Sequence, residues 1–193
     1  MLKQTIAGAL VVSAVASANA AEWDLDKAHS SAEFKVSHMV VSNVVGKFTD
    51  MDATLQFDGK DLATGSVEAT VQIASINTAN ERRDGHLKSA DFFDAEQYPT
   101  MTFKSTKVIP GEGNEFQLVG DLTMRGVTKP VTFDCEFNGT VDAMGTTKAG
   151  FSATTKVNRQ DFGVNWNKTL DNGGLVAGDQ VKITLELEFN KKS

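Results

Sequence analysis

The strongest constraint on the fold of this chain is a regular alternation of apolar and polar residues. Between Val181 and Phe189 every odd position is apolar and every even position is polar. When such a segment is extended, it has one apolar face and one polar face, which is typical of a half-buried β-strand. The same pattern recurs over residues 32–38, 53–57, 67–73, 101–108, 116–122, 131–137 and 149–157. It is weakest over 101–108, where Lys107 occupies a position that the alternation assigns to an apolar residue. The alternation therefore predicts eight strands.

Short turn-forming sequences separate these stretches, among them Asp58-Gly59, Arg125-Gly126 and Asn172-Gly173-Gly174. Eight strands with one apolar face need either closure or a second sheet to cover that face. We therefore expect an all-β fold, formed by a single eight-stranded antiparallel barrel that is closed on itself.

Two connections depart from the alternating pattern. Thr78-Ala79-Asn80-Glu81 matches a capping box, in which a hydroxyl and a carboxylate cap each other's backbone N–H groups. It predicts a short helix over 79–90, between the third and the fourth strand. The second connection, 158–180, contains Trp166 and is long enough to serve as a lid or a binding loop.

The first residues predict a signal peptide rather than a part of the fold. Lys3 precedes an apolar run from Ile6 to Ala18, which at about thirteen residues is too short to cross a bilayer as a helix. The run ends in Ala18-Asn19-Ala20, which has the small residues that signal peptidase recognises. We expect a signal peptide over 1–20, cleavage between Ala20 and Ala21, and an exported domain over 21–193 with no integral membrane segment.

Composition argues against several classes of function. The formal net charge of −6 disfavours nucleic-acid binding, and the single cysteine, Cys135, excludes a disulfide framework or a multi-cysteine zinc site. Cys135 lies in the apolar phase of its strand, which predicts a buried, unreactive thiol. The three histidines, His29, His38 and His86, do not share metal-ligand spacing, and no catalytic motif is present. We expect no metal, no cofactor and no enzymatic activity.

The inward positions combine phenylalanines with small residues, and this mixture permits two kinds of interior. Small residues such as Ala69, Gly120 and Ala153 beside aromatic rings can leave an apolar tunnel, since an eight-stranded barrel is just wide enough to hold a ligand. The same side chains can instead interdigitate and fill the barrel. The pattern alone leaves both open. An outer-membrane barrel, which needs aromatic girdles, is disfavoured because the chain has one tyrosine and two tryptophans.

Arg82-Arg83-Asp84, with His86, forms the densest polar cluster in the sequence. One interpretation is a solvated helix face with weak local ion pairs. The other is a rim of the barrel mouth that contacts the polar head of a ligand.

Short motifs follow one another along the mature chain: Asp26-x-x-His29-Ser30, Gly46-Lys47-Phe48, Ser75-Ile76-x-Thr78, Arg83-Asp84-x-His86-Leu87, Asp91-Phe92-Phe93, Tyr98-Pro99, Gly120-Asp121-Leu122-Thr123, Gly126-Val127-Thr128-Lys129-Pro130-Val131 and Asn158-Arg159-x-Asp161-Phe162-Gly163. Each is short, but their order and spacing together are specific. In these motifs the chain resembles the YceI family of exported, lipocalin-like proteins that bind polyisoprenoids or similar lipids.

The resemblance implies a lipocalin-like barrel in the periplasm that holds a long-chain isoprenoid, of the polyprenyl or quinone type, along an apolar bore. A non-enzymatic interaction or stress module of the cell envelope, with a packed barrel, is the alternative, and a homodimer is left open. The polar head of the lipid is expected at the rim residues Arg83, Asp84 and His86. The expected ligand contacts inside the barrel are Phe34, Val36, His38, Phe57, Ala69, Val71, Phe103, Phe116, Leu118, Phe133, Phe151, Ala153 and Trp166.

Overall fold

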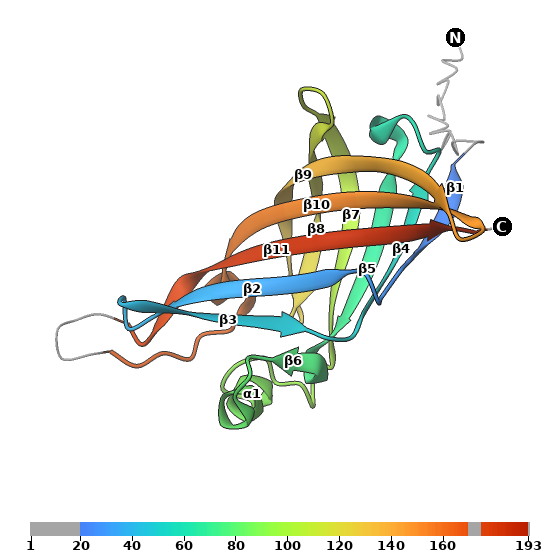
Figure 1. Cartoon of the computed structure of the whole chain (residues 1–193). Coiled ribbons are helices and arrows are strands. Elements are labelled where there is room, and N and C mark those ends of the chain that lie inside the picture. The colour runs from blue at the N-terminus through green and yellow to red at the C-terminus, as the bar shows by residue number, and fades with distance from the viewer. Residues whose placement is uncertain (1–19, 170–174, 193) are drawn as a thin grey trace, which may run out of the picture.

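The computed structural model describes residues 20–169 and 175–192, which form one antiparallel sheet with a short helix beside it (Figure 1). The strands are β1 (Ala21–Leu25), β2 (Ser31–His38), β3 (Ser42–Phe48), β4 (Met51–Phe57), β5 (Ser66–Gln72), β6 (Ile76–Asn77), β7 (Thr100–Pro110), β8 (Glu115–Met124), β9 (Val127–Ala143), β10 (Thr146–Asn158) and β11 (Ala177–Lys191). The helix α1 spans Glu81–Lys88, and a 3-10 turn spans Arg159–Phe162. Among the described residues, no helix is long and apolar enough to cross a membrane. The expected signal peptide, apart from Ala20, lies outside the described part of the chain.

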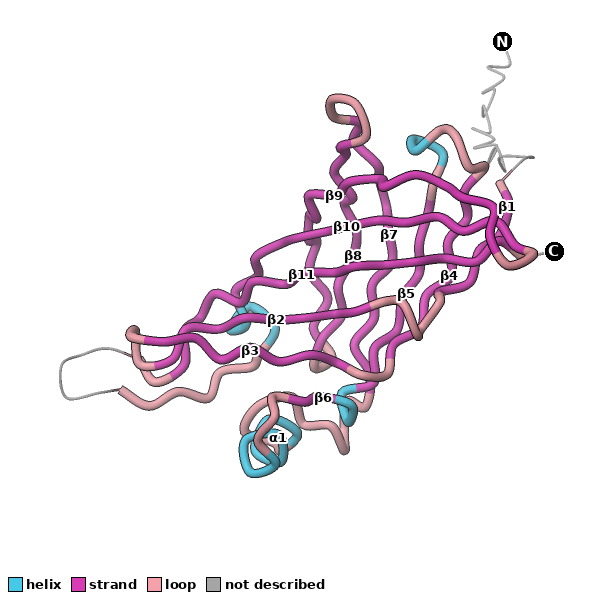
Figure 2. The backbone as a smooth tube through the Cα atoms, in the orientation of Figure 1, coloured by secondary structure: helices cyan, strands magenta, loops and turns pink. Residues whose placement is uncertain are grey.

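The sheet closes because β11 pairs with β10 along one edge and with both β1 and β2 along the other (Figure 2). β1 adjoins the end of β11 and β2 adjoins its earlier part, so the two act as one strand that is interrupted at 26–30. β4 pairs with β1 and β3 pairs with β2 in the same way. β3 and β4 are therefore a second interrupted strand. Counted like this the barrel has eight strands, and of the described strands only β6 lies outside it, paired to β3.

The eight-stranded barrel expected from the sequence is confirmed, since each alternating stretch lies in a different strand of the closed barrel. The weak stretch over 101–108 has a specific cause. In β7 the pairing with β8 shifts between Ser105 and Lys107, which marks a β-bulge. An extra residue at a bulge reverses the phase of the side chains beyond it. Lys107 consequently lies on the outer face, opposite Val119, and Val108 returns to the inner face.

Aromatic rings fill the part of the interior where β1 pairs with β11. Trp23 is 1% exposed, donates its Nε1–H to the carbonyl of Phe57 at 2.8 Å, and packs against the ring of that residue. The rings of Phe137, Phe151 and Phe189 continue the cluster, with centroids 5.1 Å apart for the first pair and 6.0 Å for the second. Burial of each such side chain stabilises the fold by about 1.5–3 kcal/mol. This part of the barrel has a packed interior, which is one of the two alternatives that the sequence pattern permitted.

The predicted helix forms at the end of the barrel opposite the start of β1 and the end of β11 (Figure 1). It begins at Glu81 rather than 79 and ends at Lys88 rather than 90. The predicted capping box is wrong. Asn80 is the N-cap, and its side-chain oxygen accepts the backbone N–H of Arg83 at 3.0 Å. Ala79 has a φ of 58°, in the left-handed region, and the helix therefore cannot extend back to it. Thr78 is buried instead, and both its backbone N–H and its hydroxyl donate to Asp84.

Candidate ligand-binding cavity

A cavity of about 420 Å³ occupies the remainder of the barrel interior. Inward side chains from every strand of the closed barrel bound it, and residues of α1 and of the segment that follows α1 close one end. Cavities that hold small molecules in proteins have volumes of about 300–1,000 Å³. The hollow interior is thus present as well, beside the packed aromatic cluster.

Every residue that the sequence predicted as a ligand contact inside the barrel lies on the wall of this cavity, whereas the inward Gly120 does not. The set comprises Phe34, Val36, His38, Phe57, Ala69, Val71, Phe103, Phe116, Leu118, Phe133, Phe151, Ala153 and Trp166. Of the three expected rim residues, Arg83 and His86 also line the cavity, whereas Asp84 does not. Contact of any of these side chains with a ligand remains a prediction.

The wall is almost entirely apolar. Cys135 belongs to it, is 8% exposed, and has its pKa raised to about 12 because burial disfavours the thiolate. The expectation of a buried thiol is confirmed, and the raised pKa keeps the sulfur protonated at neutral pH. The cavity therefore offers carbon surface and very little hydrogen bonding.

Two glycines keep phenylalanine rings against the wall. A Cβ added at Gly120 in β8 would lie 2.3 Å from Cζ of Phe103 and 2.6 Å from the carbonyl oxygen of Lys104. A Cβ added at Gly46 in β3 would lie 2.4 Å from Cζ of Phe34. Both rings occupy the space that a side chain at the glycine would need. The glycines therefore allow these rings to cover the neighbouring strand closely.

Three rings from separate segments meet where α1 closes the cavity. His86 of α1, Phe92 of the following segment and Trp166 of the connection between β10 and β11 have centroids 5.0–5.1 Å apart in each pair. All three line the cavity. We call them the end cluster. The long connection predicted as a lid or binding loop also supplies the wall residues Arg159, Val164, Val176 and Ala177, and its Phe162 and Val164 are each 2% exposed.

The charged residues of α1 are tied to the chain just before the helix. Arg83 donates its Nε–H to the Thr78 hydroxyl at 2.7 Å and an Nη2–H to the Thr78 carbonyl at 2.8 Å. Asp84 accepts from the same threonine. A guanidinium carries five N–H groups, and these contacts use two of them. His86 Nε2 lies 2.9 Å from a carboxylate oxygen of Asp91.

Arg159 is a structural residue of the site to which the sequence analysis gave no role. It is 5% exposed and holds the connection after β10 against the start of β11. Its guanidinium donates to the carbonyls of Val164, Trp166, Ala177 and Gly178 and to the carboxylate of Asp179. Arg159 lies in a connection without alternating residues, so the hydrophobic pattern could not predict its role. The sequence marked it only as part of the motif Asn158-Arg159-x-Asp161-Phe162-Gly163.

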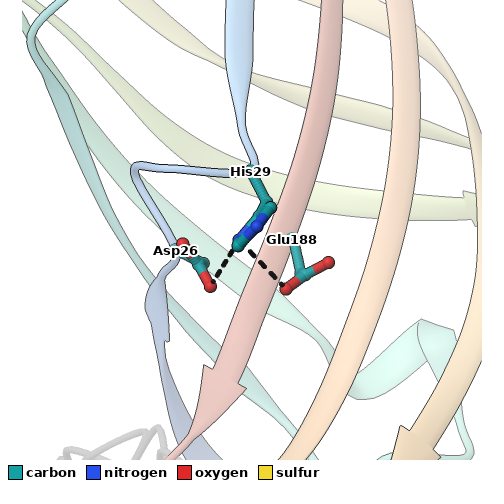
Figure 3. A group of neighbouring side chains, drawn as sticks. All are labelled: Asp26, His29 and Glu188. Atoms are coloured by element: carbon teal, nitrogen blue, oxygen red, sulfur yellow. Dashed lines mark ion pairs between the residues drawn. The ribbon is translucent and has the colours of Figure 1, made fainter.

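A polar cluster lies outside the cavity, at the interruption between β1 and β2 (Figure 3). His29 Nδ1 lies 3.1 Å from Asp26 and 3.8 Å from Glu188. The spacing of these three side chains suits a metal ion, but the Lys148 ammonium contacts the same two carboxylate oxygens, at 3.1 Å and 2.5 Å. Hydrogen bonds from His29 and then Lys148 hold the pKa of Asp26 far below its usual range. The lysine already supplies the positive charge, and the cluster fastens the two strand segments to β10 and β11.

Comparison with known sequences gives a consistent set of relatives. A sequence profile of the YceI-like domain matches residues 23–189. A UPF0312 protein of Staphylococcus aureus (strain N315) is 41% identical over 170 residues, which cover 87% of this chain and 96% of the relative.

Solved structures agree. The YceI protein of Campylobacter jejuni superposes with a TM-score of 0.70 at 36% identity, over 88% of this chain and 97% of its own. BcnA of Burkholderia cenocepacia gives 0.72 at 26% identity, over 85% and 98%. A polyisoprenoid binding domain from Saccharophagus degradans, implicated in plant cell wall breakdown, gives 0.66 over 88% and 98%. At 13% identity, this last likeness is one of fold alone.

Proposed function

Because the chain belongs to the YceI-like family, we propose that it is a binding or carrier protein that holds a long-chain isoprenoid lipid in its barrel cavity. The lipid is of the polyprenyl or quinone type. One neighbour that shares the fold is described as a polyisoprenoid binding domain, so a barrel of this architecture suits such a ligand.

The observation that carries the proposal is the apolar cavity of about 420 Å³. Each CH₂ group that leaves water for such a wall gains about 0.8 kcal/mol. Ordering a flexible tail offsets much of that gain, but a tail that is sheathed over several isoprene units is still held. The wall offers almost no partner for a polar ligand, and an aliphatic chain needs none.

The proposal places the polar head of the lipid at the α1 end of the cavity. Arg83 and His86 lie on the wall there, and Arg83 has N–H groups beyond those that bind Thr78. A diphosphate, hydroxyl or quinone oxygen needs such donors when it leaves water. Asp84 contributes indirectly, because it fixes Thr78, to which Arg83 is bonded.

We also propose that the protein works in the periplasm after removal of residues 1–20. The signal-like start of the chain supports export. The first strand begins at Ala21, directly after the expected cleavage site, so no residue of the barrel would be lost.

The alternative, an envelope module with a packed barrel, depends on a filled interior. The aromatic cluster fills only part of the barrel, and the cavity occupies the rest. We therefore favour the carrier. We propose no catalytic step, since the thiol of Cys135 is protonated at neutral pH and the wall around it is apolar.

Mass spectrometry of a solvent extract of the protein, purified from its native host without detergent, tests the proposal. We expect isoprenoid lipids that together amount to close to one molecule per chain. An Ala69→Trp variant, whose added ring would occupy the cavity, is purified in parallel and is expected to yield little lipid. Repeatedly empty extracts of the unmodified protein would contradict the carrier function.

A further inference from the structure

The turn between β2 and β3 projects at one end of the barrel (Figure 1). It exposes three consecutive apolar side chains. Met39, Val40 and Val41 are 40%, 74% and 87% exposed. We call them the tip residues. Met39 and Val40 have φ of 50° and 65°, and the N–H of Val41 donates to the carbonyl of His38. Two positive φ angles define a turn that strongly favours Asn-Gly. A β-branched valine is strained at a positive φ, and its exposed apolar side chain lowers solubility. The tip residues are therefore candidates for a role other than folding.

A row of lysines crosses the outer surface beside this turn. Lys35 on β2 lies directly opposite Lys182 on β11, and Lys182 lies directly opposite Lys156 on β10. All three are exposed, and none forms an ion pair with another described residue. Like charges directly opposite one another destabilise a sheet. In a chain of formal net charge −6, this row is a local concentration of positive charge that suits an anionic partner.

The spacing of the two features matches the depth of a lipid headgroup layer. Lys35 precedes Met39 by four residues, which is about 13 Å along a strand. Amphipathic elements bury their apolar face about 5–10 Å into the boundary between headgroups and acyl chains, and lysine side chains extend along such surfaces toward the phosphates. With the tip residues at that boundary, the lysine row lies at the height of the headgroups.

The cavity reaches the same end of the molecule. Val36, His38 and Val44 line it from β2 and β3, and Ala177 lines it from β11. His38 directly precedes the first tip residue. A lipid chain that leaves the cavity on this side emerges beside the tip residues.

We propose that the protein docks on an anionic lipid bilayer, with the tip residues inserted among the headgroups and Lys35, Lys156 and Lys182 in contact with lipid phosphates. The purpose of docking, exchange of cargo with the membrane, rests on the proposed function. Docking itself requires no cargo and is measured without it.

Cosedimentation with vesicles that contain no isoprenoid provides the test. One set of vesicles is phosphatidylcholine alone, and the other contains phosphatidylglycerol in addition. The double variant V40D/V41D is expected to lose at least about tenfold in binding to anionic vesicles. The double variant K35A/K182A is expected to lose about fivefold per lysine on anionic vesicles and to equal the unmodified protein on neutral ones.

Met144→Asp is the matched control. Met144 is 98% exposed in the turn between β9 and β10, at the opposite end of the barrel. This variant is expected to bind like the unmodified protein. The proposal is overturned if the unmodified protein stays in the supernatant with anionic vesicles, or if V40D/V41D binds as well as Met144→Asp.

Lipid extracts of the same variants separate this proposal from the proposed function. Retained cargo in V40D/V41D together with lost vesicle binding supports both. If extracts of the unmodified protein contain no lipid, but the protein still binds vesicles and loses that binding in V40D/V41D, docking is supported and the carrier function is contradicted. Binding that depends on the lysines but not on the tip residues overturns insertion.

Discussion

At the scale of single residues, alanines determine how much of the barrel stays open. Ala69 and Ala153 lie on the cavity wall among phenylalanine rings. Ala149, by contrast, is 1% exposed, does not line the cavity, and pairs with Phe189 in the packed part of the interior. One residue type therefore stands in two environments, which makes a controlled comparison possible.

Ala69→Trp is expected to fold and to block lipid uptake, because the indole extends into the cavity. Ala149→Trp finds no such space and is expected to lower the free energy of unfolding by about 1–3 kcal/mol or more. Thermal melts and lipid extracts of both variants give the answer. If Ala69→Trp melts as low as Ala149→Trp, or carries a full lipid complement, our account of the cavity is wrong.

The second residue-scale prediction concerns Arg83. Arg83→Ala is expected to weaken binding of a lipid with a polar head by about tenfold, because it removes charged donors from the cavity wall. Binding of a headless hydrocarbon of equal length is expected to change little. Both affinities are measured by titration with fluorescent analogues.

Thr78→Val is the control for this experiment, since it removes the hydroxyl that binds Arg83 and Asp84 but leaves both charges. It is expected to lower the melting temperature and to reduce both affinities to a similar extent. Equal losses for the two ligands in Arg83→Ala as well would mean that the arginine only holds α1 in place.

At the scale of elements, the sequence predicted those strands in which apolar and polar side chains alternate regularly. Alternation predicted the wall residues because it states which face of a strand a side chain occupies. β3 escaped detection because Val44 and Val45 are both apolar and Gly46 offers no side chain. β1 alternates, but over five residues only, and it breaks off at Asp26. Cavity volume depends on how rings from distant strands pack, and no local pattern encodes that. Phe92 and Arg159 lie in irregular segments, where phase carries no information.

The connection between β10 and β11 depends on one buried cation. Arg159→Met leaves four carbonyls without their donor and is expected to lower the free energy of unfolding by about 2–4 kcal/mol. Because Trp166 is one of these carbonyl partners, its fluorescence is expected to shift to longer wavelengths. Arg159→Lys is expected to recover little, since an ammonium does not reproduce the planar fork. A denaturation midpoint for Arg159→Met equal to that of the unmodified protein would contradict this role.

The polar cluster between β1 and β2 predicts a dependence of stability on pH. The folded pKa of Asp26 lies well below the value of about 3.9 in an unfolded chain. Its contribution is therefore complete above that value and is lost as the pH falls toward the folded pKa, because the unfolded state binds the proton first. Urea unfolding between pH 7 and pH 3 is expected to show a flatter profile for Asp26→Asn, with lower stability at pH 7. Glu96→Gln, at an exposed position, is expected to reproduce the unmodified profile.

At the scale of the whole molecule, two interrupted strands unite the barrel and its projecting end. β1 and β2, with β4 and β3 alongside, run from the packed aromatic cluster, past the cavity, to the tip residues. The start of β1, the end of β11 and the β9–β10 turn lie at the other end (Figure 1). The two ends of the molecule therefore have different surfaces.

This arrangement accommodates processing at the N-terminus. The precursor is expected to be cleaved after Ala20, and the mature chain to begin at the first residue of β1. N-terminal sequencing of the protein from the periplasmic fraction is the measurement. Retention of Met1 or Leu2 would contradict export by this route.

The apolar wall has a consequence for what a purified sample contains. A surface with almost no hydrogen-bonding groups distinguishes lipid tails by their girth and length and hardly by any other property of the tail. Competing chains of similar shape then share the cavity according to their abundance. The composition of the bound lipids therefore reflects the composition of the lipids around the protein at the moment of isolation. Growth conditions that alter those lipids would change the contents of the barrel without any change in the protein.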